Sequence, residues 1–179
     1  MAEYSIRLLA RDDRRSGFSS GDVELDRFFL RYAGQNQFRH HIGTTYVAVA
    51  DEFILGFVTV SPGELASEVP REQLPGRLPD YPLPVLRIAR LAVDARARGR
   101  GVGRSLLRFV LRLGVEMRDR YGCIGLVVDA KPAATSFYVR LGFQALTEVR
   151  GGLGDRPKPT PMFLPIQRVM EAVSDNSAD

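Results

Sequence analysis

Cysteine, histidine and long apolar runs are scarce in this sequence of 179 residues. The single cysteine, Cys123, cannot form an internal disulfide, and the only histidines, His40 and His41, are adjacent, so we expect no metal site built from these residues. Cys123 lies in the apolar run CIGLVVDA, where we predict a buried packing residue rather than a nucleophile. No run approaches the roughly 20 apolar residues that span a bilayer, and the first residues lack the features of a signal peptide. We therefore expect a cytoplasmic protein without membrane contact.

Positive charge is concentrated in one part of the chain. Residues 84–121 hold ten arginines against three acidic residues, whereas the last nine residues hold three acids and no base. Arginine outnumbers lysine 23 to 2, and its planar guanidinium suits phosphate. The concentration predicts attraction to a phosphate backbone. For any single arginine, such as Arg104, Arg108 or Arg112 on one helix face, simple solvation is the alternative.

Apolar periodicity predicts one mixed α/β sheet with helices packed on it. Strands are expected at 5–11, 44–51, 53–61, 85–94, 123–130 and within 161–169, and 44–61 reads as a hairpin. Helices are expected at 21–34 with Gly34 as the stop, at 104–122, and at 133–143. Loops are expected at 70–84, which holds five prolines, and at 150–161, and a polar tail at 171–179.

The segment RARGRGVGRSLL (96–107) joins a strand to a helix. A disordered nucleic-acid arm or a solvated linker would not run directly into the leucines of an amphipathic helix. A glycine turn before a helix instead exposes amides at the positive end of the helix dipole, which suits a phosphate. The spacing fits neither the nucleotide P-loop nor the dinucleotide-binding motif.

The pattern R-x-x-G-x-G does fit, at 98–103 after LAVD, and a helix ending F-Y-x-x-x-G-F follows at 137–143. With both motifs in this order, the sequence resembles the GNAT family of acetyl-CoA-dependent N-acetyltransferases, over about 44–147. The resemblance implies a single-domain α/β GNAT-like fold over 1–170, with a mixed, mostly antiparallel sheet flanked by helices. It also implies acetyl-CoA as co-substrate.

The resemblance assigns roles to particular residues. The pyrophosphate of acetyl-CoA is expected on the loop, and the pantetheine arm along the strand before it. Tyr138 is expected to act as general acid, because a phenol is protonated at neutral pH and can donate to the departing sulfur; at its helical position it could instead be a packed core tyrosine. We find no convincing general base, and Lys131 stands where many family members carry Asn, which puts in doubt the cofactor contact made there. The cofactor-binding residues are Leu91, Ala92, Val93, Arg98, Gly99, Arg100, Gly101, Val102, Gly103 and Arg104.

Further stretches, among them LDRFFLRYAGQNQ and VVDAKPAATSFYVRLGF, resemble the GNAT toxins of toxin–antitoxin modules. That resemblance implies acetylation of the α-amino group of aminoacyl-tRNA, arrest of translation, a cognate antitoxin and a homodimer. One alternative is a GNAT enzyme that acetylates a small amine, a peptide or a protein. A second is a noncatalytic RNA-binding or acyl-CoA-sensing module on the same fold.

Overall fold

The computed structural model describes residues 3–65, 71–146 and 159–175. It divides into two compact units, residues 1–61 with 88–110 and residues 62–87 with 111–179. The boundaries fall inside strands β3 (Phe53–Leu65) and β4 (Leu83–Val93) and helix α3 (Val102–Arg120).

The first unit is built on an antiparallel hairpin. Strand β2 (Thr44–Ala50) pairs with β3 through a tight turn in which Asp51 adopts a left-handed φ of 53°. Aspartate tolerates this conformation because its short polar side chain can hydrogen-bond locally. Strand β1 (Ser5–Leu8), shorter than expected, pairs antiparallel with the other side of β2. The predicted hairpin is confirmed.

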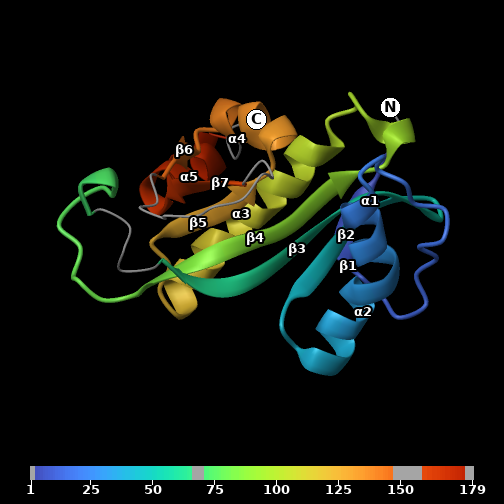
Figure 1. Cartoon of the computed structure of the whole chain (residues 1–179), viewed down its shortest axis with the longest axis horizontal. Helices are drawn as coiled ribbons and strands as arrows, with labels where there is room; N and C mark the ends of the chain where they lie inside the picture. The colour runs from blue at the N-terminus through green and yellow to red at the C-terminus, as the bar shows by residue number, and fades with distance from the viewer. Residues whose placement is uncertain (1–2, 66–70, 147–158, 176–179) are drawn as a thin grey trace, which may run out of the picture. The chain divides into compact units, whose positions relative to one another are not determined.

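A helical segment lies between β1 and β2 in the chain and packs against β2 and β3 (Figure 1). It begins after Asp22, whose carboxylate accepts hydrogen bonds from two first-turn amides. Our prediction that Gly34 ends the helix is wrong, because glycine weakens a helix without breaking it. The segment ends where His41 adopts a φ of 54°. Its parts are α1 (Val23–Arg27), a π-helical turn (Phe28–Tyr32), α2 (Ala33–Gln35) and a second π-helical turn (Asn36–His40).

Three phenylalanines hold this helical segment on the strands. The rings of Phe29 and Phe57 stack with centroids 4.3 Å apart, and the ring of Phe18 meets both of them edge-on. All three side chains are buried. Burial of such a side chain stabilises a fold by roughly 1.5–3 kcal/mol.

The second unit contains the end of β3, the start of β4 and three further strands. Strand β5 (Gly125–Ala130) pairs antiparallel with β7 (Thr160–Pro165), and the short β6 (Gln144–Ala145) pairs with the other side of β7. Leu83, Val85, Val127 and Phe163 are buried in one apolar cluster. Helices α4 (Thr135–Arg140) and α5 (Ile166–Asp175) belong to this unit, and α5 packs against β5 and β7.

The structure corrects several expected boundaries near the C-terminus. The expected helix 133–143 is a 3-10 turn (Pro132–Ala134) followed by the shorter α4. The expected strand within 161–169 ends at Pro165, and α5 follows it into the region where we expected only a polar tail. Most of the expected loop 150–161, and the last four residues of the tail, lie outside the described residues. The expected loop 70–84 contains a 3-10 turn (Arg71–Gln73) before β4 begins.

The strand order is β1-β2-β3-β4-β5-β7-β6 in one sheet. The four pairings β1–β2, β2–β3, β5–β7 and β6–β7 are antiparallel. Helix α3 joins β4 to β5, its neighbour in the strand order, and a helical connection of this kind allows two strands to run parallel. The predicted mixed, mostly antiparallel α/β sheet is confirmed.

Candidate active site

The turn between β4 and α3 opens its backbone to solvent. Gly99 and Gly101 have φ of 73° and 79°, a region that glycine adopts without steric cost, and the space that a Cβ would take is empty at both. Helix α3 begins at Val102, two residues earlier than expected. Gly103 therefore lies in the first helical turn, and the left-handed conformations come from the other two glycines.

Several amides of this turn find no acceptor among the residues that the structure describes. Within the described residues, no group accepts a hydrogen bond from the N–H of Gly99, Gly101, Val102, Gly103 or Arg104, and the bond from the Ser105 N–H to the Gly101 carbonyl, at 3.0 Å, is the first of the helix. Unpaired amides at a helix start carry partial positive charge. The turn is therefore suited to bind the oxygens of a phosphate.

Asp94 fastens the N-terminal segment to this turn. Its carboxylate, 2% exposed, accepts hydrogen bonds from the Arg96 guanidinium at 2.9 and 3.0 Å and from the Ser19 amide at 3.1 Å. The Ala95 amide donates to the Ser19 carbonyl at 2.9 Å. The hydrogen bond from Arg96, aided by those from the amides, lowers the pKa of Asp94 from 3.8 to about 2. We call Asp94, Arg96 and Ser19 the Asp94 clamp.

Two arginines of the turn also hold the N-terminal segment. Arg96 donates to the Gly17 carbonyl at 3.1 Å, and Arg98 donates to the Ser20 carbonyl. The Arg98 amide donates weakly, at 3.5 Å, to the Ala95 carbonyl. Arg98 begins the R-x-x-G-x-G motif, yet its side chain is directed to a protein carbonyl. Sequence spacing does not reveal this role, because Ser20 is 78 positions away from Arg98.

Gly56 allows α3 to lie close to the strands of the first unit. A Cβ at Gly56 would lie 3.0 Å from side-chain atoms of Val102 and Leu106 and from the carbonyl oxygen of Ala92. The start of α3, and with it the glycine turn, is therefore held against β3 at Gly56, which also lies close to Ala92 near the end of β4. The last three residues of β4 are Leu91, Ala92 and Val93, which we predicted to line the pantetheine arm.

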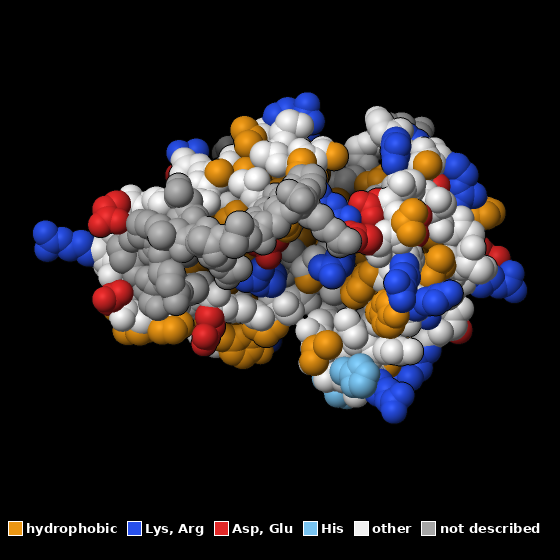
Figure 2. Space-filling view, viewed as in Figure 1, with side chains coloured by type: hydrophobic (Ala, Val, Ile, Leu, Met, Phe, Trp, Pro, Cys, Tyr) orange, Lys and Arg blue, Asp and Glu red, His pale blue; other side chains and the backbone are white. Residues whose placement is uncertain are grey.

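The arginines after the turn are exposed, as the helical pattern predicts. Arg104, Arg108 and Arg112 lie on the solvent side of α3, whereas Leu106 and Val110 are fully buried. A second basic surface lies on the helical segment of the first unit, where positive side chains and the histidines gather in Figure 2. Its exposed members are Arg27, Arg31, Arg39, His40 and His41.

Tyr138 lies in the second unit, on α4. Its side chain is 4% exposed, and its ring meets those of Phe137 and Phe143 edge-on with centroids 5.1 and 5.3 Å apart. Within the described part of the chain, no group forms a hydrogen bond with its hydroxyl. Burial raises the pKa of Tyr138 from 10.0 to about 12, so the phenol stays protonated throughout the physiological range. The turn of residues 98–104 belongs to the first unit.

Other predicted features can be placed as well. Cys123 is 5% exposed, its thiol donates to the Gly125 carbonyl at 3.2 Å, and burial raises its pKa, in agreement with a packing role. Lys131 precedes the 3-10 turn before α4, and its carbonyl accepts from the Ala134 amide at 2.8 Å. Over the described ranges, no group of His, Cys, Asp and Glu is placed to hold a metal ion. No helix among those described is long and apolar enough to cross a membrane.

Comparisons with known proteins agree with this geometry. Residues 41–145 match the family model of the acetyltransferase (GNAT) domain. A tRNA-acetylating toxin of Mycobacterium tuberculosis (strain ATCC 25618 / H37Rv) is 32% identical over 146 residues, which cover 80% of this chain and 87% of the relative.

Two solved structures share the fold. AtaT complexed with acetyl-methionyl-tRNAfMet superposes with a TM-score of 0.79 at 22% identity, covering 95% of this chain and 99% of that one. AtaTR bound with AcCoA superposes with a TM-score of 0.77 at 22% identity, covering 96% and 99%. The family model spans more than half of the chain and includes both the glycine turn and Tyr138; this chain belongs to the acetyltransferase (GNAT) domain family and is an N-acetyltransferase.

Proposed function

We propose that this enzyme transfers the acetyl group of acetyl-CoA to the α-amino group of an aminoacyl-tRNA and thereby blocks translation. The observation that carries the proposal is the open glycine turn at the start of α3, with its unpaired amides, in a chain that belongs to the acetyltransferase family. The substrate class is supported by the M. tuberculosis toxin, which is similar over four fifths of this chain. The catalytic domain would span residues 1–170.

The fit to acetyl-CoA rests on the chemistry of the turn. The amides of Gly99, Gly101, Val102 and Gly103 would bind the diphosphate oxygens, with the exposed guanidiniums of Arg100 and Arg104 adding charge. Arg98 would act through the loop backbone that its side chain steadies at Ser20. Backbone groups of Leu91, Ala92 and Val93 would hold the pantetheine arm.

Tyr138 would assist departure of the sulfur. The amine nitrogen attacks the thioester carbonyl and the carbon–sulfur bond breaks. In the complete reaction, the nitrogen loses one proton and the sulfur of coenzyme A gains one. A phenol with a pKa of about 12 is a weaker acid than a thiol of pKa about 8.5, so complete transfer from Tyr138 alone is uphill by about 5 kcal/mol. Tyr138 would therefore donate a hydrogen bond to the developing thiolate. If its proton passes to the sulfur, the proton lost by the attacking amine would replace it.

The expected partners follow from the same proposal. AtaT has been solved bound to the C-terminus of the antitoxin AtaR, and we propose a cognate antitoxin for this chain as well. A homodimer and a cytoplasmic site of action, where charged tRNA is found, remain predictions. The basic surface on α3, with Arg104, Arg108 and Arg112, would attract the RNA backbone in a salt-dependent manner.

The test is a transfer assay with radiolabelled acetyl-CoA and total tRNA, charged in one sample and deacylated in the other. We expect label in the charged pool, recovered as N-acetyl amino acid after mild alkaline hydrolysis of the ester. Equal label in both pools, or in neither, contradicts the proposal. Label that appears instead in added polyamines or peptides would favour the small-amine or protein acetyltransferase.

A further inference from the structure

Phe53, the first residue of β3, is a large apolar side chain left in solvent. It is 62% exposed, directly after the β2–β3 turn, while its neighbour Ile54 is 5% exposed. A single exposed aromatic residue is ordinary on a protein surface. Phe53 differs because it lines two hollows, each of about 250 Å³.

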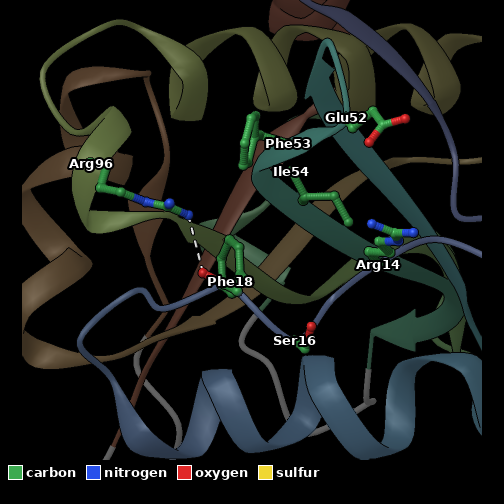
Figure 3. A pocket seen from close by; sticks show the side chains of 8 residues that line it. Arg14, Ser16, Phe18, Glu52, Phe53, Ile54 and Arg96 are labelled. Atoms are coloured by element: carbon green, nitrogen blue, oxygen red, sulfur yellow. Dashed lines mark hydrogen bonds between the residues drawn. The ribbon is translucent and has the colours of Figure 1, made fainter.

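The first hollow lies between the N-terminal segment and the start of β3. Figure 3 shows Arg96 at one side, Arg14 and Glu52 at the other, and Phe53 and Ile54 between them. Ser16, Gly17 and Phe18 complete the lining. The dashed line in Figure 3 is the hydrogen bond from Arg96 to the Gly17 carbonyl, which fixes this wall.

The second hollow lies at the end of β4. Arg96 and Phe53 line it again, together with Asp51, Asp94 and Arg100. Asp94 is already paired with Arg96 in the Asp94 clamp. Among the described residues, the side chains of Arg14 and Arg100 have no ion-pair or hydrogen-bond partner, so one unpaired cation borders each hollow.

We propose that Phe53, Arg14 and Arg96, which line the first hollow, bind an unpaired nucleotide of the RNA substrate, with the base against the Phe53 ring. The inference rests on the proposed function, in which the substrate is a tRNA with a single-stranded 3′ end. Aromatic rings stack bases of any sequence, and arginines neutralise the flanking phosphates. Carboxylates at the rim, from Asp51 and Glu52, can accept hydrogen bonds from base amino groups.

The same chemistry disfavours other occupants. An acidic peptide would meet the two rim carboxylates, Asp51 and Glu52, without gaining from the exposed ring. The adenosine of coenzyme A is a nucleotide too, but none of residues 98–104, on which the diphosphate is expected, lines the first hollow; Arg100 lines only the second. The volume of each hollow, about 250 Å³, is just below the roughly 300–1,000 Å³ of typical small-molecule pockets. A volume of this size suits one ring system on an open surface.

The absence of tryptophan from the sequence allows a direct test. Phe53→Trp introduces a single indole, whose fluorescence is quenched when a base stacks on it. We expect quenching by a short single-stranded oligoribonucleotide and little by the same strand in a duplex. Tyr121→Trp, at a site that is 81% exposed, is the matched control and should respond to neither.

Kinetics give the second readout. Loss of one stacked base by Phe53→Ala should raise KM for aminoacyl-tRNA about 5- to 150-fold, because each base stack contributes roughly 1–3 kcal/mol. The Kd for acetyl-CoA should not change, and Phe53→Tyr should restore KM. Arg14→Gln should raise KM less, and its effect should shrink in high salt.

The outcomes separate this inference from the proposed function. Suppose that the wild type acetylates charged tRNA, but RNA does not change the indole fluorescence of Phe53→Trp and Phe53→Ala leaves KM unchanged. Then only the inference is wrong, and the proposed function stands. It is also wrong if coenzyme A or a poly-glutamate peptide quenches that indole while RNA does not. If single-stranded RNA quenches it and no tRNA is acetylated, the RNA site stands and the proposed reaction fails.

Discussion

The substitution Tyr138→Phe separates catalysis from packing at the predicted general acid. Phenylalanine keeps the two edge-on contacts with Phe137 and Phe143 and removes a hydroxyl that is buried without a hydrogen-bond partner among the described residues. We expect turnover to fall about 10²- to 10⁴-fold, the range over which a positioned acid contributes. We expect the free energy of unfolding at neutral pH to stay level or to rise, because a buried unsatisfied polar group is removed.

The free energy of unfolding at alkaline pH shows how much the buried phenol of Tyr138 contributes. Folding raises the pKa of Tyr138 from 10.0 to about 12, and two units correspond to about 2.7 kcal/mol. Because the folded pKa is the higher one, this stability is present below pH 10 and is lost as the pH rises through 12. Near pH 11.5, the wild type should have lost about 2 kcal/mol that Tyr138→Phe does not lose.

The assays are urea unfolding near neutral pH and near pH 11.5, and radiolabel transfer to charged tRNA. Tyr121→Phe is the control, because Tyr121 is 81% exposed and should affect neither readout. Turnover of the wild type should rise with pH through about 8, as the α-amino group loses its proton, and should not fall again below about pH 11. Wild-type turnover in Tyr138→Phe would refute the acid role and would leave Tyr138 a packing residue.

Four further substitutions, one of them a control at Gly76, test the backbone and the polar contacts of the two units. Gly125→Ala should destabilise the fold by about 3 kcal/mol or more, because its Cβ would lie 2.3 Å from the Leu164 carbonyl oxygen; unchanged urea unfolding would contradict this. Asp94→Asn should remove about 2 kcal/mol of stability that the wild type holds above pH 4 and loses as the pH falls through 2, so an equal acid dependence in both proteins would refute the Asp94 clamp. Gly101→Ala and Gly76→Ala should each cost about 1–2 kcal/mol of stability, because both glycines have similar positive φ and open surroundings. Calorimetry should show weaker acetyl-CoA binding for Gly101→Ala alone, and an equal loss for both would exclude the glycine turn as the diphosphate site.

Much of the fold follows from short-range signals in the sequence. To predict the β2–β3 hairpin, it is enough to find two residues between two apolar runs. To predict the glycine turn, it is enough to find a strand pattern before it and leucines at helical spacing after it. These signals act over a few residues, so they predicted both the strand–turn–helix around Gly101 and the family to which it belongs. They failed where neighbouring structure overrides local preference, as at Gly34, which lies inside a helix, and at residues 166–175, which form α5.

By itself, the sequence determined the family, the mixed α/β class and the glycine turn, because each is encoded by residues close together in the chain. Only the tertiary structure decided which side chains lose contact with water and which polar groups meet across long separations. Burial raises the pKa of Tyr138, and the Asp94 clamp joins residues 75 positions apart. Such effects depend on where the sheet brings distant segments together, and neither spacing nor composition carries that information.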